Sequence, residues 1–450
     1  MTEDASFNAQ GATDRGALPR AFACAFLFFL VIGSYYIVKS VREAVLVSRF
    51  GATTHPKLYI LVCLVTLPVG AGIAAMARRW PRQILLPVGY VACGLVFLGF
   101  WIAVPRLAHS SEHVQQTMRA AYYVWVSVFI LCANCLFWAF TNDLFSKEQG
   151  TRLYGLIGAG GILGGVAGGA LAKVYAKTLG AFGLVILSAI GMGACAVVAV
   201  LIHRRSPGRR REEPQQVLGT VRLADVPRLF AAPYVALIAA IVVLHTFSET
   251  TVNLQTDAIQ AGFKLSEDAY AEFRGGYNAV MNSLALFTQI AIVTWMHRRW
   301  GPKAGLLVLP AATILLGPVL LWKAPEGNLH VPWLGTIPRQ LAVLSLVGIP
   351  LQAFAYSIWQ SSKELLYVPT DPAVKYQAKA MIDTFGFRLG DNFAAVLALV
   401  PPNGVARVGW FSAVGVAGCV VWGATAWRVG RKFDARSATA PPAAGVPPRG

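Results

Sequence analysis

The sequence predicts an all-α membrane protein with about twelve transmembrane helices, arranged as two pseudo-symmetric six-helix halves. Three observations lead to this fold class. Hydrophobic residues make up 56% of the chain and charged residues only 13%, with a mean hydropathy of +0.55. Apolar stretches of about 20 residues, the length of a membrane-spanning helix, recur along the chain. Two short motifs recur at nearly the same offset.

Twelve apolar stretches are long enough to cross a bilayer. They cover residues 21–47, 58–77, 84–104, 120–144, 153–176, 180–202, 234–260, 275–296, 304–322, 340–362, 379–400 and 408–427. The first stretch is too long for the core of a signal peptide and is followed by no small-residue cleavage site. We therefore expect it to remain in the protein as a helix.

The basic residues indicate how the chain lies in the membrane. The net charge of +18 could suggest nucleic acid, but Lys and Arg stand in short runs between apolar stretches, so no nucleic-acid partner is expected. The connections on the side that holds both termini contain more than twice as many Lys and Arg residues as the opposite connections. We expect cytoplasmic termini in a bacterial-type inner (plasma) membrane, with the lipid bilayer as partner and no obligate protein partner.

The longest hydrophilic interior segment, rich in Arg and Pro, divides the chain near its midpoint and is typical of a linker. The predicted organisation is a disordered cytoplasmic tail at 1–20, a six-helix half at 21–202, a cytoplasmic linker at 203–232, a second six-helix half at 233–427 and a disordered cytoplasmic tail at 428–450.

Two motif pairs support this division independently of hydropathy. Arg78-Arg79-Trp80 follows the second span and Arg298-Arg299-Trp300 follows the eighth, at an offset of 220 residues. A tryptophan followed after four residues by an acid and a leucine occurs at Trp138 and again at Trp359, at an offset of 221. The alternative is that the two Arg-Arg-Trp tripeptides occur at membrane boundaries by coincidence.

This layout resembles the major facilitator superfamily, which has basic loops after helices 2 and 8. The loop ARRWPRQ departs from that superfamily because it lacks the acidic residue and the glycine of its loop motif. The resemblance implies two halves that rock about a central site near the middle of the membrane.

Charged residues inside the apolar stretches are candidate functional groups, because each charge at the centre of a membrane helix costs about 2.5–3.5 kcal/mol on insertion scales. The first span holds Lys39, Arg42 and Glu43 at i, i+3 and i+4, on one helix face. One interpretation is a Lys39–Glu43 pair, with Arg42 reaching the membrane interface. The other is a cationic patch that faces a central cavity.

The seventh span carries a polar stripe in which His245, Glu249, Asn253 and Asp257 step by four. His245 is either a hydrogen-bonded core histidine or, beside Glu249, a proton carrier.

Two other spans carry polar residues with different expected roles. In the eighth, Asn278 and Asn282 are four residues apart and Gln289 follows seven residues later, and we interpret all three as forming hydrogen bonds between helices. In the eleventh, Lys379, Asp383, Arg388 and Asp391 are either a solute site or structural pairs.

The fifth span repeats glycine every four residues on two adjacent helix faces, Gly160, Gly164 and Gly168 on one and Gly161, Gly165 and Gly169 on the other. Such faces favour close helix packing. The chain contains no GxxxxGK[ST] motif, so it is not expected to hydrolyse a nucleotide as fuel. We expect no enzyme activity, no cofactor and no metal, and transport driven by exchange or by a gradient.

Several segments resemble one family, the ATP/ADP translocases or nucleotide transporters of plastids and obligate intracellular bacteria. YYIVKSVREAVLV in the first span is similar to the family's I-L-R-x-x-K-D pattern, and residues 137–142 are similar to its F-W-x-F-x-N pattern. Residues 363–390 are similar to its K-E-x-x-Y-x-P-x-D and K-A-x-I-D-x-x-x-x-R-L-G elements. The resemblance implies exchange of ATP for ADP, or import of other nucleotides.

The resemblance also implies substrate-binding positions. It places a family cation on Arg42, an acid on Glu249 and basic residues on Lys363, Lys379 and Arg388, and Arg and Lys suit phosphate groups. With the charge pattern, the predicted substrate-binding set is Lys39, Arg42, Glu43, Asn142, Asp143, Glu249, Asn253, Lys363, Glu364, Lys379, Asp383 and Arg388. The chain departs from the family in the fourth span, which lacks its acid, and at Asn253 and Gln255, where the family has lysines.

The predicted function is secondary transport of an organic anion, with nucleotide exchange by alternating access as the leading hypothesis. One alternative is a proton-coupled carrier of another small solute that uses His245 and Glu249. A second alternative is a non-transporting membrane protein or sensor, although neither predicted tail is long enough for an appended soluble domain.

Overall fold

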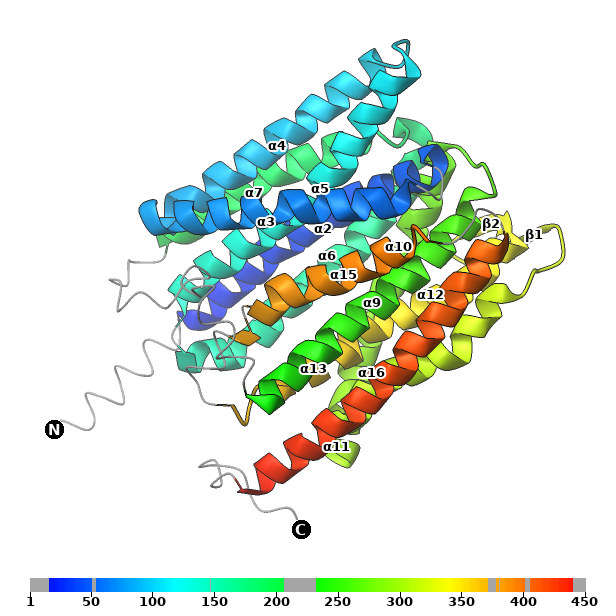
Figure 1. Ribbon diagram of the computed structural model, residues 1–450. Coiled ribbons are helices and arrows are strands. Elements are labelled where there is room, and N and C mark those ends of the chain that lie inside the picture. The colour runs from blue at the N-terminus through cyan, green and yellow to red at the C-terminus, as the bar shows by residue number, and fades with distance from the viewer. Residues whose placement is uncertain are drawn as a thin grey trace. The chain divides into compact units, whose positions relative to one another are not determined.

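The protein is almost entirely helical in the computed structural model, which describes residues 16–50, 54–145, 147–205, 232–370, 378–379, 381–400 and 405–439 (Figure 1). The helices before the predicted linker are α2 (Ala17–Arg49), α3 (His55–Arg79), α4 (Arg82–Arg106), α5 (Glu112–Leu144), α6 (Lys147–Leu179) and α7 (Val185–Arg205). The helical fold class predicted from the sequence is confirmed.

The helices after the predicted linker are α9 (Pro233–Ala261), α10 (Glu267–Thr288), α11 (Thr294–Leu316), α12 (Arg339–Phe354), α13 (Gln360–Leu366), α15 (Phe387–Leu397) and α16 (Val405–Thr439). Short π-helical turns at Gln289–Val293 and Ala355–Trp359 continue α10 into α11 and α12 into α13. A third, at Ile382–Gly386, precedes α15, and a 3-10 turn at Gly317–Leu321 follows α11.

Ten helical segments among the described residues are long and apolar enough to cross a membrane. The eighth and ninth predicted spans fall on one of these segments, Glu267–Leu321. This segment bends at Gly301, whose φ of 71° is a conformation that glycine adopts without steric cost. The eleventh predicted span falls on shorter helices, so the count of twelve stays a prediction.

Helices extend into both predicted tails. Helix α2 begins at Ala17 and α16 continues to Thr439, so residues 17–20 and 428–439 are helical rather than disordered. The end of α16 is held by aromatic contacts, because the Arg436 guanidinium lies 4.4 Å from the Tyr234 ring centroid. Most of the predicted linker, 206–231, and the remainder of both tails lie outside the described residues, so these boundaries stay predictions.

The helices form two compact units. The first comprises Met1–Thr220, Asp257–Leu286 and Ala324–Ser345, and the second comprises Val221–Thr256, Phe287–Lys323 and Leu346–Gly450. The end of α9 and most of α10 therefore belong to the unit of the N-terminal helices. The two predicted halves of the sequence do not coincide with these units, and the repeat itself stays a prediction.

In the first unit, α6 packs along α2, while α4 packs against α5 and α7 (Figure 1). A Cβ atom at Gly160, Gly164 or Gly168 would overlap a carbonyl oxygen of α2. On the adjacent face, a Cβ at Gly165 would lie 2.6 Å from Asn282 Oδ1, and one at Gly169 would lie 2.6 Å from the Ala279 nitrogen, both in α10. The predicted glycine packing is confirmed, and it holds α2 and α10 on adjacent faces of α6.

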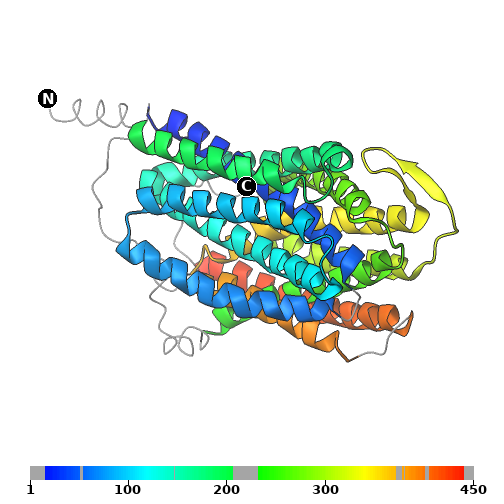
Figure 2. The same cartoon turned by 90° about the horizontal axis from the view of Figure 1, so that it is seen from above.

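A β-hairpin, which the sequence analysis did not predict, also belongs to the first unit. Strands β1 (Asn328–Val331) and β2 (Gly335–Pro338) pair antiparallel, and Figure 2 shows them in yellow at the right-hand edge. Lys173 Nζ, near the end of α6, donates a hydrogen bond of 3.3 Å to the Leu334 carbonyl oxygen. The hairpin is therefore attached to the α6 end of this unit.

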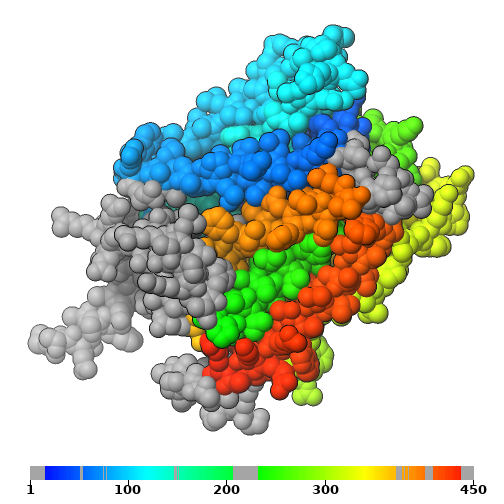
Figure 3. Space-filling view, in the orientation of Figure 1, coloured from blue at the N-terminus to red at the C-terminus, as the bar shows by residue number. Residues whose placement is uncertain are grey.

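In the second unit, α9 packs between α15 and α16. In Figure 3, α9 is green, α15 is orange and α16 is red. A Cβ atom at Gly390 of α15 would overlap the Val243 carbonyl oxygen of α9, and one at Gly418 of α16 would lie 2.8 Å from the Phe247 ring. Helix α16 also packs against α11. These contacts position the polar residues of α9 within the unit.

Candidate functional site

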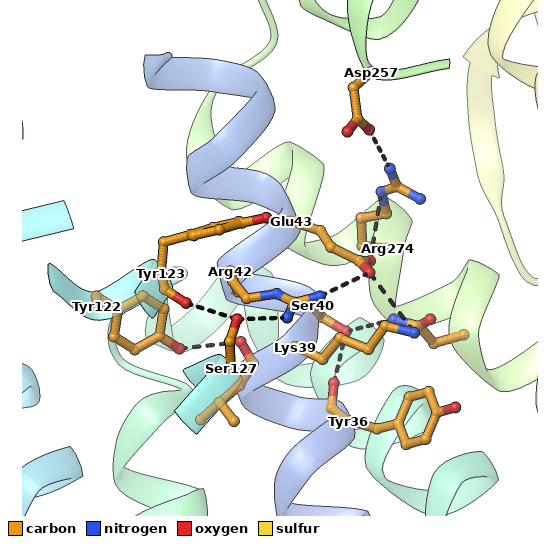
Figure 4. A network of polar contacts seen from close by, with 12 residues as sticks. Tyr36, Lys39, Ser40, Arg42, Glu43, Tyr122, Tyr123, Ser127, Asp257 and Arg274 are labelled. Atoms are coloured by element: carbon orange, nitrogen blue, oxygen red, sulfur yellow. Dashed lines mark hydrogen bonds and ion pairs between the residues drawn. The ribbon is translucent and has the colours of Figure 1, made fainter. Parts of the chain in front are cut away.

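Buried and half-buried charges of α2 and α10 form the candidate site in the first unit (Figure 4). The Glu43 carboxylate lies at the centre of three cations. It is 3.7 Å from Lys39 Nζ, 3.8 Å from Arg42 Nη2 and 3.7 Å from Arg274 Nε. The Lys39–Glu43 pair considered from the sequence is present, but as part of a larger network.

Arg42 contacts α5 within the first unit. Its Nη1 atom donates a hydrogen bond of 3.2 Å to Ser127 Oγ in α5, and its guanidinium carbon lies 5.4 Å from the Tyr123 ring centroid. The Tyr122 hydroxyl donates to the Val38 carbonyl oxygen at 3.1 Å and so ties α5 to α2 at the same level. Arg42 is therefore held inside the helix bundle of this unit, beside Glu43.

Arg274 is the member of this network that sequence reasoning missed. Arg274 is 6% exposed, and its side chain lies between two carboxylates, Glu43 and Asp257, since Nη2 is 3.4 Å from Asp257 Oδ1. The eighth predicted span begins at residue 275, one residue after Arg274, whereas helix α10 begins at Glu267 and includes Arg274. The spacing of Arg274, Asn278 and Asn282, each four residues apart, was the available signal, because it places all three on one helix face.

Charge-assisted hydrogen bonds from an N–H group to a carboxylate oxygen are typically about 2.7–2.9 Å long. The ion pairs of this network are longer. Among the residues that the structure describes, four buried atoms of the network have no hydrogen-bond partner: Arg42 Nε, Glu43 Oε2, Arg274 Nε and Asn278 Oδ1. Unpaired buried polar groups are costly. The two arginine N–H groups can therefore donate to an additional anionic group.

A second charge cluster, elsewhere in the first unit, is paired more tightly. Glu267 accepts hydrogen bonds from Arg49 and from Arg119, the latter at 2.7 Å. Lys173 Nζ donates to Glu272 at 3.0 Å, and Asp268 accepts from the Ala181 backbone nitrogen at 2.6 Å. These short bonds connect the ends of α2, α5, α6 and α10, and we interpret this cluster as structural.

The predicted cations of the second unit each have a carboxylate partner there. Lys363 Nζ donates to Asp383 at 2.8 Å, Lys379 pairs with Glu364, and Arg388 Nη1 lies 3.6 Å from Asp391 Oδ2. The sequence left two interpretations of the eleventh span, a solute site and structural pairs. These contacts agree with structural pairs.

His245 lies in an aromatic cluster of the second unit. Its ring stacks on Trp359 with centroids 4.7 Å apart, and Nε2 is 3.8 Å from Glu249 Oε2. Neither ring nitrogen has a hydrogen-bond partner among the described residues, so His245 differs from the hydrogen-bonded core histidine considered above. Asn253, one turn along α9 from Glu249, is half-buried.

Asn142 and Asp143 lie at the end of α5 and do not join the α2 charges. The Asn142 side-chain oxygen accepts a hydrogen bond of 2.7 Å from the Tyr154 hydroxyl, and Asp143 pairs with Arg82. Asp143 lies about 24 Å along the helix from Ser127, at about 1.5 Å per residue. Their predicted role in substrate binding has no support from this placement.

Comparison with known proteins agrees with the resemblance found in the sequence. Residues 101–401 match the family model described as TLC ATP/ADP transporter. The chain is 24% identical over 476 residues to ADP,ATP carrier protein 1 of Chlamydia muridarum, a match that covers 92% of this chain and 88% of that protein. It is 25% identical over 422 residues to the chloroplastic ADP,ATP carrier protein 2 of Arabidopsis thaliana, covering 82% and 67%.

Solved structures of secondary transporters share the fold. A D-xylose–proton symporter superimposes with a TM-score of 0.60 at 15% identity, covering 89% of this chain and 96% of that chain. The nucleoside transporter NupG superimposes with a TM-score of 0.56 at 14% identity, covering 92% and 99%. The predicted major facilitator-like fold is confirmed.

Proposed function

Because this chain belongs to the TLC ATP/ADP transporter family, we propose that it exchanges ATP for ADP across a membrane by alternating access. The chain is a multi-pass membrane transporter with a major facilitator-like fold. The names of its relatives, ADP,ATP carriers from bacteria and plastids, support the nucleotide as substrate. The bias of Lys and Arg supports cytoplasmic termini in a bacterial-type plasma membrane.

The observation that carries the proposal is the gathering of two buried cations, Lys39 and Arg274, and the half-buried Arg42 around one carboxylate. Lys39, Arg42 and Arg274 all lie within 3.8 Å of Glu43. A nucleoside triphosphate brings three to four negative charges, and guanidinium groups bind phosphate oxygens through charge-assisted hydrogen bonds. We place the phosphate groups of the substrate at this cluster. Lys363, Lys379 and Arg388 stay proposed substrate contacts.

The proposal is tested with purified protein in liposomes. Vesicles preloaded with ADP are expected to take up labelled ATP, while vesicles without internal nucleotide take up much less, because exchange needs a counter-substrate. The same vesicles are then offered a panel of labelled nucleotides. If no nucleotide of the panel enters preloaded vesicles, nucleotide exchange is wrong for this chain.

A second candidate function is a proton-coupled carrier of another small solute. It is favoured by the buried His245 ring, whose Nε2 atom faces Glu249 at 3.8 Å without a hydrogen bond. In this case Glu249→Gln abolishes the dependence of uptake on a proton gradient. Uptake that responds neither to pH nor to Glu249→Gln counts against this candidate.

A further inference from the structure

Two buried arginines of the first unit, Arg274 and Arg119, each face a carboxylate, but their hydrogen bonds differ. Arg119, 9% exposed, donates a direct hydrogen bond of 2.7 Å to Glu267. Arg274, 6% exposed, lies 3.7 Å from Glu43 through Nε and 3.4 Å from Asp257 through Nη2. Its Nε–H has no hydrogen-bond partner among the described residues. The Nε–H of Arg119 is therefore bonded to its carboxylate, whereas the Nε–H of Arg274 is not.

The packing of α6 fixes Arg274 beside the cations of α2. The two glycine faces of α6 hold α2 and α10 at close approach, and a Cβ atom at Gly275, next to Arg274, would overlap the Lys173 backbone nitrogen. One turn along α10, Asn278 Nδ2 donates a hydrogen bond of 3.1 Å to Ser40 Oγ, which follows Lys39 in α2. Rigid elements thus hold all three cations around Glu43.

We infer that Arg274 binds the phosphate groups of the substrate together with Lys39 and Arg42, and that Glu43 is an internal counter-anion which the phosphate displaces. This inference rests on the proposed function. Glu43 lies close enough to stabilise three charges in the membrane, yet too far to form short hydrogen bonds with them. A phosphate group offers more acceptor oxygens than a carboxylate, and it can accept from the Nε–H groups of Arg42 and Arg274 that Glu43 leaves unpaired.

Asp257 provides a second negative charge beside Arg274, so the guanidinium keeps one carboxylate partner when Glu43 is displaced. Its Oδ1 atom lies 3.4 Å from Arg274 Nη2, a different guanidinium nitrogen from the Nε atom that faces Glu43. Asp257 Oδ2 is in turn 3.9 Å from His55 Nδ1, so the carboxylate has contacts in α3 as well. When phosphate replaces Glu43, Asp257 keeps the guanidinium oriented.

Binding to the detergent-solubilised full chain tests the role of Arg274. Dissociation constants are measured for ATP, for ADP and for adenosine, which lacks phosphate. Arg274→Gln is expected to raise the Kd for ATP at least tenfold and to leave the Kd for adenosine unchanged. Arg119→Gln is the matched control, since it removes the same charge from an equally buried position, and its Kd for ATP stays within twofold of wild type. Equal effects of the two substitutions on ATP overturn the role of Arg274.

Glu43→Gln tests the displacement of Glu43 and does not depend on the folding of the Arg274 variant. Removing the competing carboxylate is expected to lower the Kd for ATP several-fold. A Kd that is unchanged or raised in folded protein overturns the displacement.

The two hypotheses fail in distinguishable ways. Wild-type protein that binds ATP while Arg274→Gln and Glu43→Gln behave like wild type contradicts only the present inference. Wild-type protein that binds no nucleotide contradicts the proposed function. In that case inorganic pyrophosphate is the probe, and unchanged pyrophosphate binding in both variants overturns the inference as well.

Discussion

Lys363 and Lys39 illustrate two states of a buried cation in this protein. Lys363 is 1% exposed and donates a hydrogen bond of 2.8 Å to Asp383. Lys39 is 5% exposed, but its ion pair with Glu43 measures 3.7 Å. A short bond in a low-dielectric environment favours a fixed structural pair. We therefore expect Lys363 to contribute more to stability than Lys39.

Substitution of Lys363 tests this expectation. Lys363→Gln leaves Asp383 without its cation and is expected to lower the free energy of unfolding by about 2–3 kcal/mol, below the roughly 3–5 kcal/mol for fully buried pairs because Asp383 is partly exposed. The double variant Lys363→Gln/Asp383→Asn is expected to recover most of the loss. Unfolding of the detergent-solubilised proteins measures both. A double variant as unstable as the single one contradicts a structural pair.

At the scale of the helices, α6 is the element that assembles the candidate site. Its glycines on one face accept α2, and Gly165 and Gly169 on the next face accept α10, which brings Glu43 and Arg274 together. The period of four in the sequence was sufficient to predict both faces. It could not identify the partner helices, because a glycine carries no side chain that distinguishes one neighbour from another.

Two glycines of α6 allow a matched test of this packing. Gly164→Ala places a Cβ atom on the Phe29 carbonyl oxygen, and we expect overpacking to cost about 1–3 kcal/mol. Gly158→Ala is the control, because no atom lies within 4 Å of its Cβ position. Thermal unfolding in detergent compares the two variants. Equal melting temperatures are incompatible with close packing of α6 on α2.

Other elements could not be predicted from hydropathy for identifiable reasons. Arg274 stands between Glu272 and the apolar stretch that begins at residue 275. Hydropathy averaged over neighbouring residues therefore assigns Arg274 to a connection and not to a helix. The last turns of α16 are polar in composition and are held instead by the contact of Arg436 with Tyr234. Both depend on residues distant in sequence, which a single window does not contain.

At the scale of the whole molecule, four of the connections predicted on the side opposite the termini meet within the first unit. The ends of α2 and α5 both bond Glu267 at the start of α10, and the α6–α7 connection bonds Asp268. These contacts agree with the alternation of the predicted spans. The division into two compact units, in contrast, depends on contacts such as that of Gly169 with Ala279, which no periodicity reveals.

Cysteine labelling tests the orientation of the chain. Leu329→Cys in the β-hairpin is expected to react with a membrane-impermeant maleimide added to intact cells, whereas Lys432→Cys at the end of α16 reacts only after permeabilisation. Both positions are exposed, and the seven native cysteines, all buried or half-buried, give little background. The reverse pattern means that the termini are not cytoplasmic.

The central claim is that the cations Lys39 and Arg42 of α2 bind the phosphates of an exchanged nucleotide. Nucleotide exchange by the Arg42→Ala variant tests this claim most directly. Labelled ATP uptake into ADP-loaded liposomes is measured for wild type, for Arg42→Ala and for Arg20→Ala, which removes the same charge near the start of the same helix. We predict uptake by wild type and Arg20→Ala, and none above empty liposomes by Arg42→Ala. Uptake by Arg42→Ala at the wild-type rate would contradict the account.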